Sequence, residues 1–120
     1  MEQVTGIGGV FFRARDPDTL SAWYNDMFGV SRVPRDYSTA PWMQQAGATV
    51  FAPFPSDTDY FGNPGQAWMI NFRVANLDRM IAQLRTKRIE VTVDPEIYPN
   101  GRFVRLSDSD GNRALGAQGS

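Results

Sequence analysis

One pattern of residues occurs twice along the sequence. Three positions recur with the same spacing and the same residue, which are Phe12 and Phe72, Arg13 and Arg73, and Asp18 and Asp78. Val10 and Ile70 form a similar pair at that spacing. Self-similarity at a fixed period indicates an internal duplication, so both halves should fold into the same unit.

The first copy begins with a predicted strand at residues 9–14 and continues into a helix. Asp16 suits the N-cap and Pro17 the first helical position. Apolar residues then recur on one helical face, and Gly29 is the expected end. They are Leu20, Trp23, Tyr24, Met27 and Phe28, and Trp23 should lie in the core.

The second copy repeats this order, with a predicted strand at 68–74 and Asn76 as the helix cap. Short strands should follow each helix, at 30–32, 42–45 and 49–54 and again at 90–93, 102–106 and 113–117. Asp108 to Asn112 should form the hairpin turn before the last of them. Each half therefore has the order β-α-β-β-β.

These elements predict a single α+β domain over residues 1–120. Its half-repeats cover about 5–54 and 66–118, joined by a linker at 55–65. Residues 114–120 are small and glycine-rich, so a loosely held strand or frayed tail is expected there.

The composition narrows the possible partners and location. Hydrophobic residues make up 42% of the chain and charged residues 21%, typical of a globular protein. A net charge of −1, with no basic face, disfavours nucleic acid as a partner. The longest apolar runs fall well short of the roughly 20 residues that span a bilayer. No secretory signal or cysteine points to export, so we expect a cytoplasmic protein without membrane contacts.

Four stretches carry a family resemblance: residues 6–12 leading to Asp16, residues 22–24 before Gly29, residues 70–74 leading to Leu77 and Asp78, and residues 108–112. Their order resembles the vicinal oxygen chelate superfamily, which includes glyoxalase I, bleomycin-resistance proteins and extradiol dioxygenases. The resemblance implies two facing sheets that enclose a cavity, with the helices packed outside. It also implies a homodimer, whose interface could complete the cavity.

Metal-binding members of that superfamily place one ligand on the first strand and one on the last strand of each half. The matching positions here are Gly9, Phe51, Met69 and Leu115. None offers an oxygen or imidazole donor, and a methionine sulfur is a soft ligand. The chain has no histidine and no cysteine. We therefore expect no metal and no other cofactor.

Strand alternation predicts which side chains face the cavity. Val10, Phe12, Ile70, Phe72, Val74, Val104 and Leu106 should pack against the helices. The predicted ligand-binding residues are Gly9, Phe11, Trp42, Phe51, Trp68, Met69, Asn71, Phe103, Arg105 and Leu115. Trp42 and Trp68 could stack on an aromatic ligand, or merely pack at the rim. The alternative is that the apolar residues only fill the interior.

The sequence offers several candidate catalytic acids and bases but does not single one out. Glu90, Asp94, Glu96 and Tyr98 are candidates, but nothing in the sequence puts them beside a reacting group. Arg13 and Arg73 are expected to be solvated or paired with Asp16 and Asp78.

The favoured hypothesis is metal-independent binding of a small aromatic or apolar molecule between the half-repeats. An alternative is an enzyme of the superfamily, such as a lyase, isomerase or dioxygenase, with an oxygen-only or non-standard site. A third is an interaction module. The sequence identifies neither the ligand nor a reaction.

Overall fold

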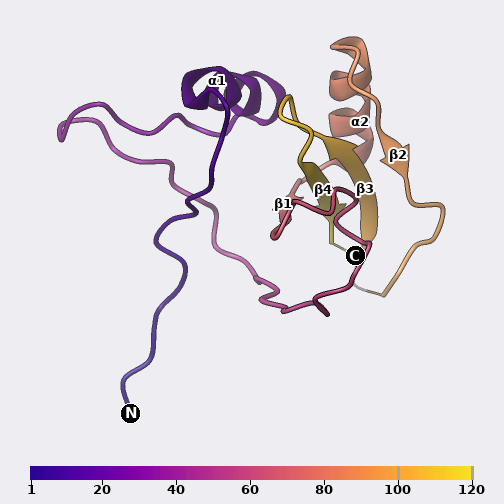
Figure 1. The fold of residues 1–120 in the computed structure, drawn as a ribbon, viewed down its shortest axis with the longest axis horizontal. Helices are drawn as coiled ribbons and strands as arrows, with labels where there is room; N and C mark the ends of the chain where they lie inside the picture. Colours follow the sequence, from indigo (N-terminus) through magenta and orange to yellow (C-terminus); the bar gives the residue numbers. More distant parts are fainter. Residues whose placement is uncertain (100, 120) are drawn as a thin grey trace.

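The computed structural model describes residues 1–99 and 101–119. Its helices are α1 (Pro17–Phe28) and α2 (Leu77–Thr86). Its strands are β1 (Ile70–Arg73), β2 (Thr92–Val93), β3 (Arg102–Ser107) and β4 (Arg113–Gln118). The strands form one sheet in the order β1-β4-β3-β2, and α2 lies beside it (Figure 1). Neither helix of the described residues is long and apolar enough to cross a membrane.

Helix α1 has the boundaries that its local signals predict. The side chain of Asp16 accepts a hydrogen bond from the Thr19 amide, and Pro17 opens the first turn. Gly29 ends the helix with φ +72°, a left-handed conformation that glycine adopts at little cost. The hydrogen bonds from Thr19 lower the pKa of the Asp16 carboxyl, because they favour its charged form.

Strand β4 lies in the middle of the sheet. It runs parallel to β1, with Asn71 opposite Leu115, and antiparallel to β3, with Arg105 opposite Leu115. Residues 114–117 are thus paired on both sides and Gln118 on one, so the expected loose strand or frayed tail is wrong for them. Ser120, at the end of that stretch, lies outside the described residues.

One face of the sheet packs against the helices. Leu77 and Ile81 of α2 form a buried cluster with Val104 of β3, and Leu106 is also buried. Phe28 of α1 stacks on Phe72 of β1 with ring centroids 5.1 Å apart. The predicted helix-facing side of the second half is therefore confirmed. Trp23, by contrast, is only half-buried and not in the core.

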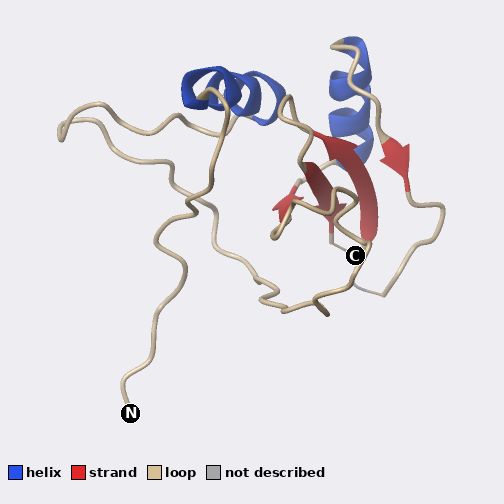
Figure 2. Ribbon diagram, in the orientation of Figure 1, coloured by secondary structure: helices blue, strands red, loops and turns tan. Residues whose placement is uncertain are grey.

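The first half forms its helix but none of its predicted strands. Residues 9–14, 30–32, 42–45 and 49–54 are irregular, and Figure 2 shows them as loop. Residues 31–54 make no backbone–backbone hydrogen bond within the described part of the chain. A strand is stabilised only by a neighbour, and here no segment lies alongside to provide one. These strand predictions are wrong for this structure, and the second sheet and the enclosed cavity are not formed by the described residues.

The irregular first half also enlarges the molecule. The radius of gyration is 15.3 Å, against about 14 Å for a compact chain of this length. Val10, expected to pack against a helix, is 57% exposed.

Candidate functional site

The face of the sheet that points away from the helices carries several of the predicted ligand-binding residues. Asn71, Leu115 and Arg105 lie in one row across β1, β4 and β3. Phe103 lies one row further on, opposite Ala117. Since directly paired residues share a face, the structure brings these four together. Met69 lies just before β1 and two residues before Asn71, so strand alternation assigns it to the same face.

Two arginines tie a segment that spans the end of the first half and most of the linker to this open face. Arg73 donates a hydrogen bond to the Gln45 carbonyl at 2.9 Å, and Arg113 donates one to the Tyr60 carbonyl at 2.9 Å. We call residues 45–62 the tethered segment. Leu115, on the face between these contacts, is only 7% exposed. Of the two expected arrangements for Arg73, the structure shows the exposed one, since Asp78 pairs with Arg102.

An open groove of about 670 Å³ lies between the two half-repeats. Phe11, Phe12 and Arg13 line it from the first half, and Gln66 to Trp68 with Asn112 line it from the second. The rings of Phe12 and Trp68 are 4.7 Å apart and tilted by 42°. Phe12 thus packs on Trp68, although alternation placed it against a helix. We call this feature the inter-repeat groove.

Gln66 holds the wall of the inter-repeat groove in place. Its amide nitrogen donates to the carbonyls of Trp68 at 2.7 Å and Arg113 at 2.8 Å, and its amide oxygen accepts from the Arg113 amide at 2.7 Å. The residue is 6% exposed. The sequence did not predict this role because Gln66 adjoins the linker, where no local pattern marks a buried polar side chain.

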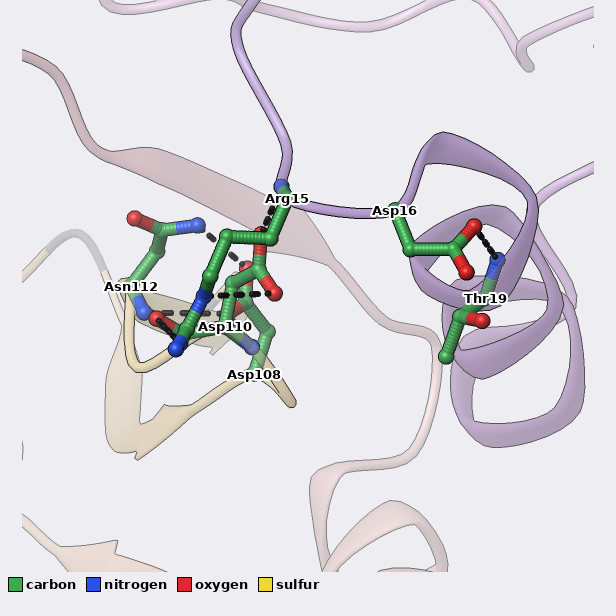
Figure 3. A network of polar contacts seen from close by, with 6 residues as sticks. All are labelled: Arg15, Asp16, Thr19, Asp108, Asp110 and Asn112. Carbon is green, nitrogen blue, oxygen red and sulfur yellow. Dashed lines mark hydrogen bonds and ion pairs between the residues drawn. The ribbon is translucent and has the colours of Figure 1, made fainter.

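The turn between β3 and β4 contacts the chain just after the residues of the first half that line the groove. The Arg15 amide donates to the Asp110 carboxylate at 3.0 Å, and its guanidinium approaches the same carboxylate at 3.6 Å. Figure 3 shows this contact beside Asp108 and Asn112. Because Arg15 is only two residues beyond Arg13, the contact fixes where residues 11–13 enter the groove.

A buried hydrogen bond joins α1 to the same turn. The Tyr24 hydroxyl donates to the Asp108 carboxylate at 2.6 Å, and Asp108 is 6% exposed. The same carboxylate accepts from the amides of Asp110 and Asn112. Burial, followed by the hydrogen bond to Asp108, raises the pKa of the Tyr24 hydroxyl well above its usual range.

Two of the candidate acid–base residues are hydrogen-bonded to each other. The Tyr98 hydroxyl donates to the Asp94 carboxylate at 2.9 Å, which raises the pKa of Tyr98 to about 12. Tyr98 also packs edge-on against Phe103, with centroids 5.8 Å apart. Tyr98 therefore stays protonated at neutral pH and is unsuited to act as a base there.

Other predicted site residues are exposed and lie in irregular segments. Trp42 is 43% exposed and Phe51 is 85% exposed, both in irregular segments. Gly9 lies beside the ring of Phe11, which is itself 95% exposed.

The four positions that hold metal ligands in related proteins do not fit a metal here. Gly9 and Phe51 lie in exposed segments, whereas Met69 and Leu115 belong to the sheet region. Their side chains supply no oxygen or nitrogen donor. Across residues 1–99 and 101–119, no three histidine, cysteine, aspartate or glutamate residues are grouped to hold an ion.

Comparison of the whole fold with solved structures gives matches over nearly the full chain. FosX, a genomically encoded fosfomycin resistance protein from Listeria monocytogenes, matches with a TM-score of 0.63 and 13% identity, over 98% of this chain and 96% of that one. Lactoylglutathione lyase from Agrobacterium tumefaciens gives 0.61 and 20%, over 98% and 96%. At these identities the likeness establishes the fold alone.

A shorter match has higher identity. TnmS3, an antibiotic binding protein from Streptomyces sp. CB03234, is 29% identical, with a TM-score of 0.41 and 45% of each chain covered. This chain thus spans less than half the length of that protein.

Comparison with curated protein sequences gives no match. The family model of the Glyoxalase/Bleomycin resistance protein/Dioxygenase superfamily matches residues 6–114, most of the sequence. The chain belongs to that superfamily.

Proposed function

We propose that the protein binds a small aromatic molecule, without a metal, in the inter-repeat groove between its two half-repeats. The observation that carries this proposal is the Phe12–Trp68 pair, which joins the two halves at 4.7 Å and forms one wall of the groove. An aromatic wall of this kind offers a flat surface on which a planar ligand can stack.

The composition of the groove supports the proposal. Its volume of about 670 Å³ falls in the range of small-molecule sites. Phe11 exposes most of its ring at the groove and has no aromatic partner among the described residues. Arg13 and Asn112 add polar groups at the edge, which would orient a ligand with an acceptor.

Titration with 2-naphthol, a planar neutral probe, tests the proposal. Protein treated with EDTA should bind it saturably, and the Phe11→Ser variant should bind about tenfold more weakly because it loses an apolar contact. Phe11 is 95% exposed, so this change should leave the melting temperature unaltered.

A matched control uses an exposed tryptophan that does not line the groove. Trp42→Ser removes an indole outside the groove and should leave the affinity for 2-naphthol unchanged. Absence of saturable binding, or binding only after a divalent metal is restored, would overturn the proposal.

We further propose that the protein forms a homodimer in the cytoplasm. Support comes from the irregular first half, where Ile7, Val33, Met43, Val50 and Phe51 each expose more than half of their surface. Apolar surface on this scale is unusual for a stable monomer. Sedimentation velocity should give a mass twice the 13.4 kDa of the chain, and a monomer at micromolar concentration would contradict this.

A further inference from the structure

Strand β2 forms one edge of the sheet, since β3 is its only neighbour among the described strands (Figure 1). The Asp94 amide donates to the Phe103 carbonyl at 3.0 Å. Hydrogen-bonded and non-hydrogen-bonded pairs alternate along an antiparallel ladder, so the backbone groups of Val91 and Val93 point away from β3. This outer edge is therefore open to another strand.

The backbone at this edge is held in place by its own side chains. Val91 and Val93 are half-buried and pack against the core cluster that α2 forms with Val104. Val91 makes no backbone–backbone hydrogen bond within the described residues. A strand that pairs with Val91 and Val93 would thus meet a fixed backbone, and would satisfy amide and carbonyl groups that the sheet leaves unpaired.

An open groove of about 470 Å³ lies between the end of α2 and this edge, and we call it the edge groove. Its lining residues include Arg85 and Arg88, with Glu90 as their one carboxylate. Both arginines are exposed, and neither forms an ion pair within the described residues. The lining therefore carries more positive than negative charge, and the arginines are not neutralised by the described part of the chain.

Arg88 occupies a position that normally favours glycine. It follows the C-cap Lys87 and has φ +63°, the one positive value at a non-glycine residue of the described chain. Glycine is the usual residue at such a position after a helix because a Cβ atom is strained there. An arginine here accepts strain that a glycine would avoid, and it places a charged side chain beside the groove.

We propose that the edge groove and the outer edge at Val91 and Val93 bind an extended acidic segment of a partner protein, which adds to the sheet beside β2. An open strand edge binds another extended backbone through main-chain hydrogen bonds. Charge complementarity makes the segment acidic, because Arg85 and Arg88 would pair with its carboxylates. This surface shares no lining residue with the inter-repeat groove, so the inference does not depend on the proposed function.

A short blocked peptide in which glutamate and valine alternate is the probe, with a dye at one end for fluorescence anisotropy. It should bind saturably, and its affinity should fall as salt is raised, because exposed charges are screened. The same peptide with lysine in place of glutamate should bind at least about tenfold more weakly.

An N-methylated version of the acidic peptide separates strand addition from simple charge attraction. It keeps the carboxylates but cannot donate hydrogen bonds along the strand, so it should bind at least about tenfold more weakly. Equal binding of the methylated peptide would show that charge alone attracts the probe, and would overturn the proposal.

Arg88→Gly is the decisive variant because it removes charge and relieves strain together. Its melting temperature should not fall, yet it should bind the acidic peptide about threefold more weakly. Adding Arg85→Gln should bring the loss to about tenfold. Arg79→Gln, at an exposed arginine earlier on α2, is the matched control and should leave the affinity unchanged.

Hydrogen exchange shows where the peptide binds. The amides of Val91 and Val93 should exchange rapidly in the free protein and slowly with the acidic peptide bound. Slow exchange in the peptide-free protein that becomes fast on dilution would mean that a second copy of the chain covers the edge, which would overturn the proposal. Absence of saturable binding, or full affinity in the double variant of Arg85 and Arg88, would also overturn it.

Discussion

Arg73 on β1 donates a 2.9 Å hydrogen bond to the carbonyl oxygen of Gln45, a residue 28 positions earlier in the chain. The contact ties the irregular first half to the sheet of the second. A Cβ atom added to Gly47 would clash with Nη1 of the same arginine. A side chain at residue 47 would therefore displace the Arg73 guanidinium from its present position.

Gly47→Ala should release this tether. The flexible Arg73 side chain must move away, and its bond to Gln45 is lost. Limited proteolysis within residues 45–62 should become several-fold faster, while the free energy of unfolding changes by less than about 0.5 kcal/mol. Gly8→Ala is the control, because nothing lies within 4 Å of its added Cβ. Equal cleavage rates in the two variants would show that Arg73 does not hold the segment.

Tyr24→Phe should destabilise the junction between α1 and the β3–β4 turn. It removes the donor to Asp108, whose carboxylate keeps its bonds to the Asp110 and Asn112 amides. The expected loss is about 1–3 kcal/mol, typical of a hydrogen bond to a charged group, measured by urea unfolding. Tyr37→Phe, at a fully exposed tyrosine, should change nothing. A loss of similar size in both variants would contradict the role of this bond.

Alkaline pH should lower the free energy of unfolding through ionisation of the same residue, Tyr24. The pKa of Tyr24 is raised above its ordinary value of 10.0, so the folded state holds its proton where the unfolded state releases it. Its contribution to stability is complete below about pH 10 and falls as the pH rises further. Tyr98, with a pKa raised to about 12, acts in the same direction. Unfolding free energies measured from pH 8 to 11 should decline less in Tyr24→Phe than in the wild type, and identical slopes would refute the assignment.

Gln66→Glu should disrupt the wall of the inter-repeat groove. A carboxylate in that position would face the carbonyls of Trp68 and Arg113, to which the amide nitrogen of Gln66 now donates. Leaving a buried charge unpaired in this way should cost about 2–3 kcal/mol at pH 7. The loss should shrink near pH 4, where a protonated glutamic acid can donate one bond again. Gln44→Glu, at an exposed position, is the control, and a pH-independent loss at residue 66 would argue against this account.

Features with local causes could be predicted from the sequence. Asp16, Pro17 and Gly29 act on neighbouring backbone groups, and α1 begins and ends where they predict. Alternation within β1 and β3 likewise placed Asn71 and Arg105 on one face, because the period of a strand does not depend on distant residues.

Features that depend on distant neighbours could not be predicted. Residues 49–54 have the composition of a strand, but composition does not say whether another segment will lie beside them. Phe12 follows the same pattern as Phe72, yet it contacts Trp68 because its segment forms no strand. Gln66 is held in the groove wall by its hydrogen bonds to β4. No residue pattern near Gln66 predicts that contact.

Chemical-shift mapping of isotope-labelled, EDTA-treated protein with 2-naphthol tests metal-free binding in the inter-repeat groove most directly. The account predicts saturable shifts of the Ala67, Trp68 and Asn112 amides, with the amides of α2 unaffected. Shifts scattered over the molecule, or no saturable shift until a divalent metal is added, would contradict it.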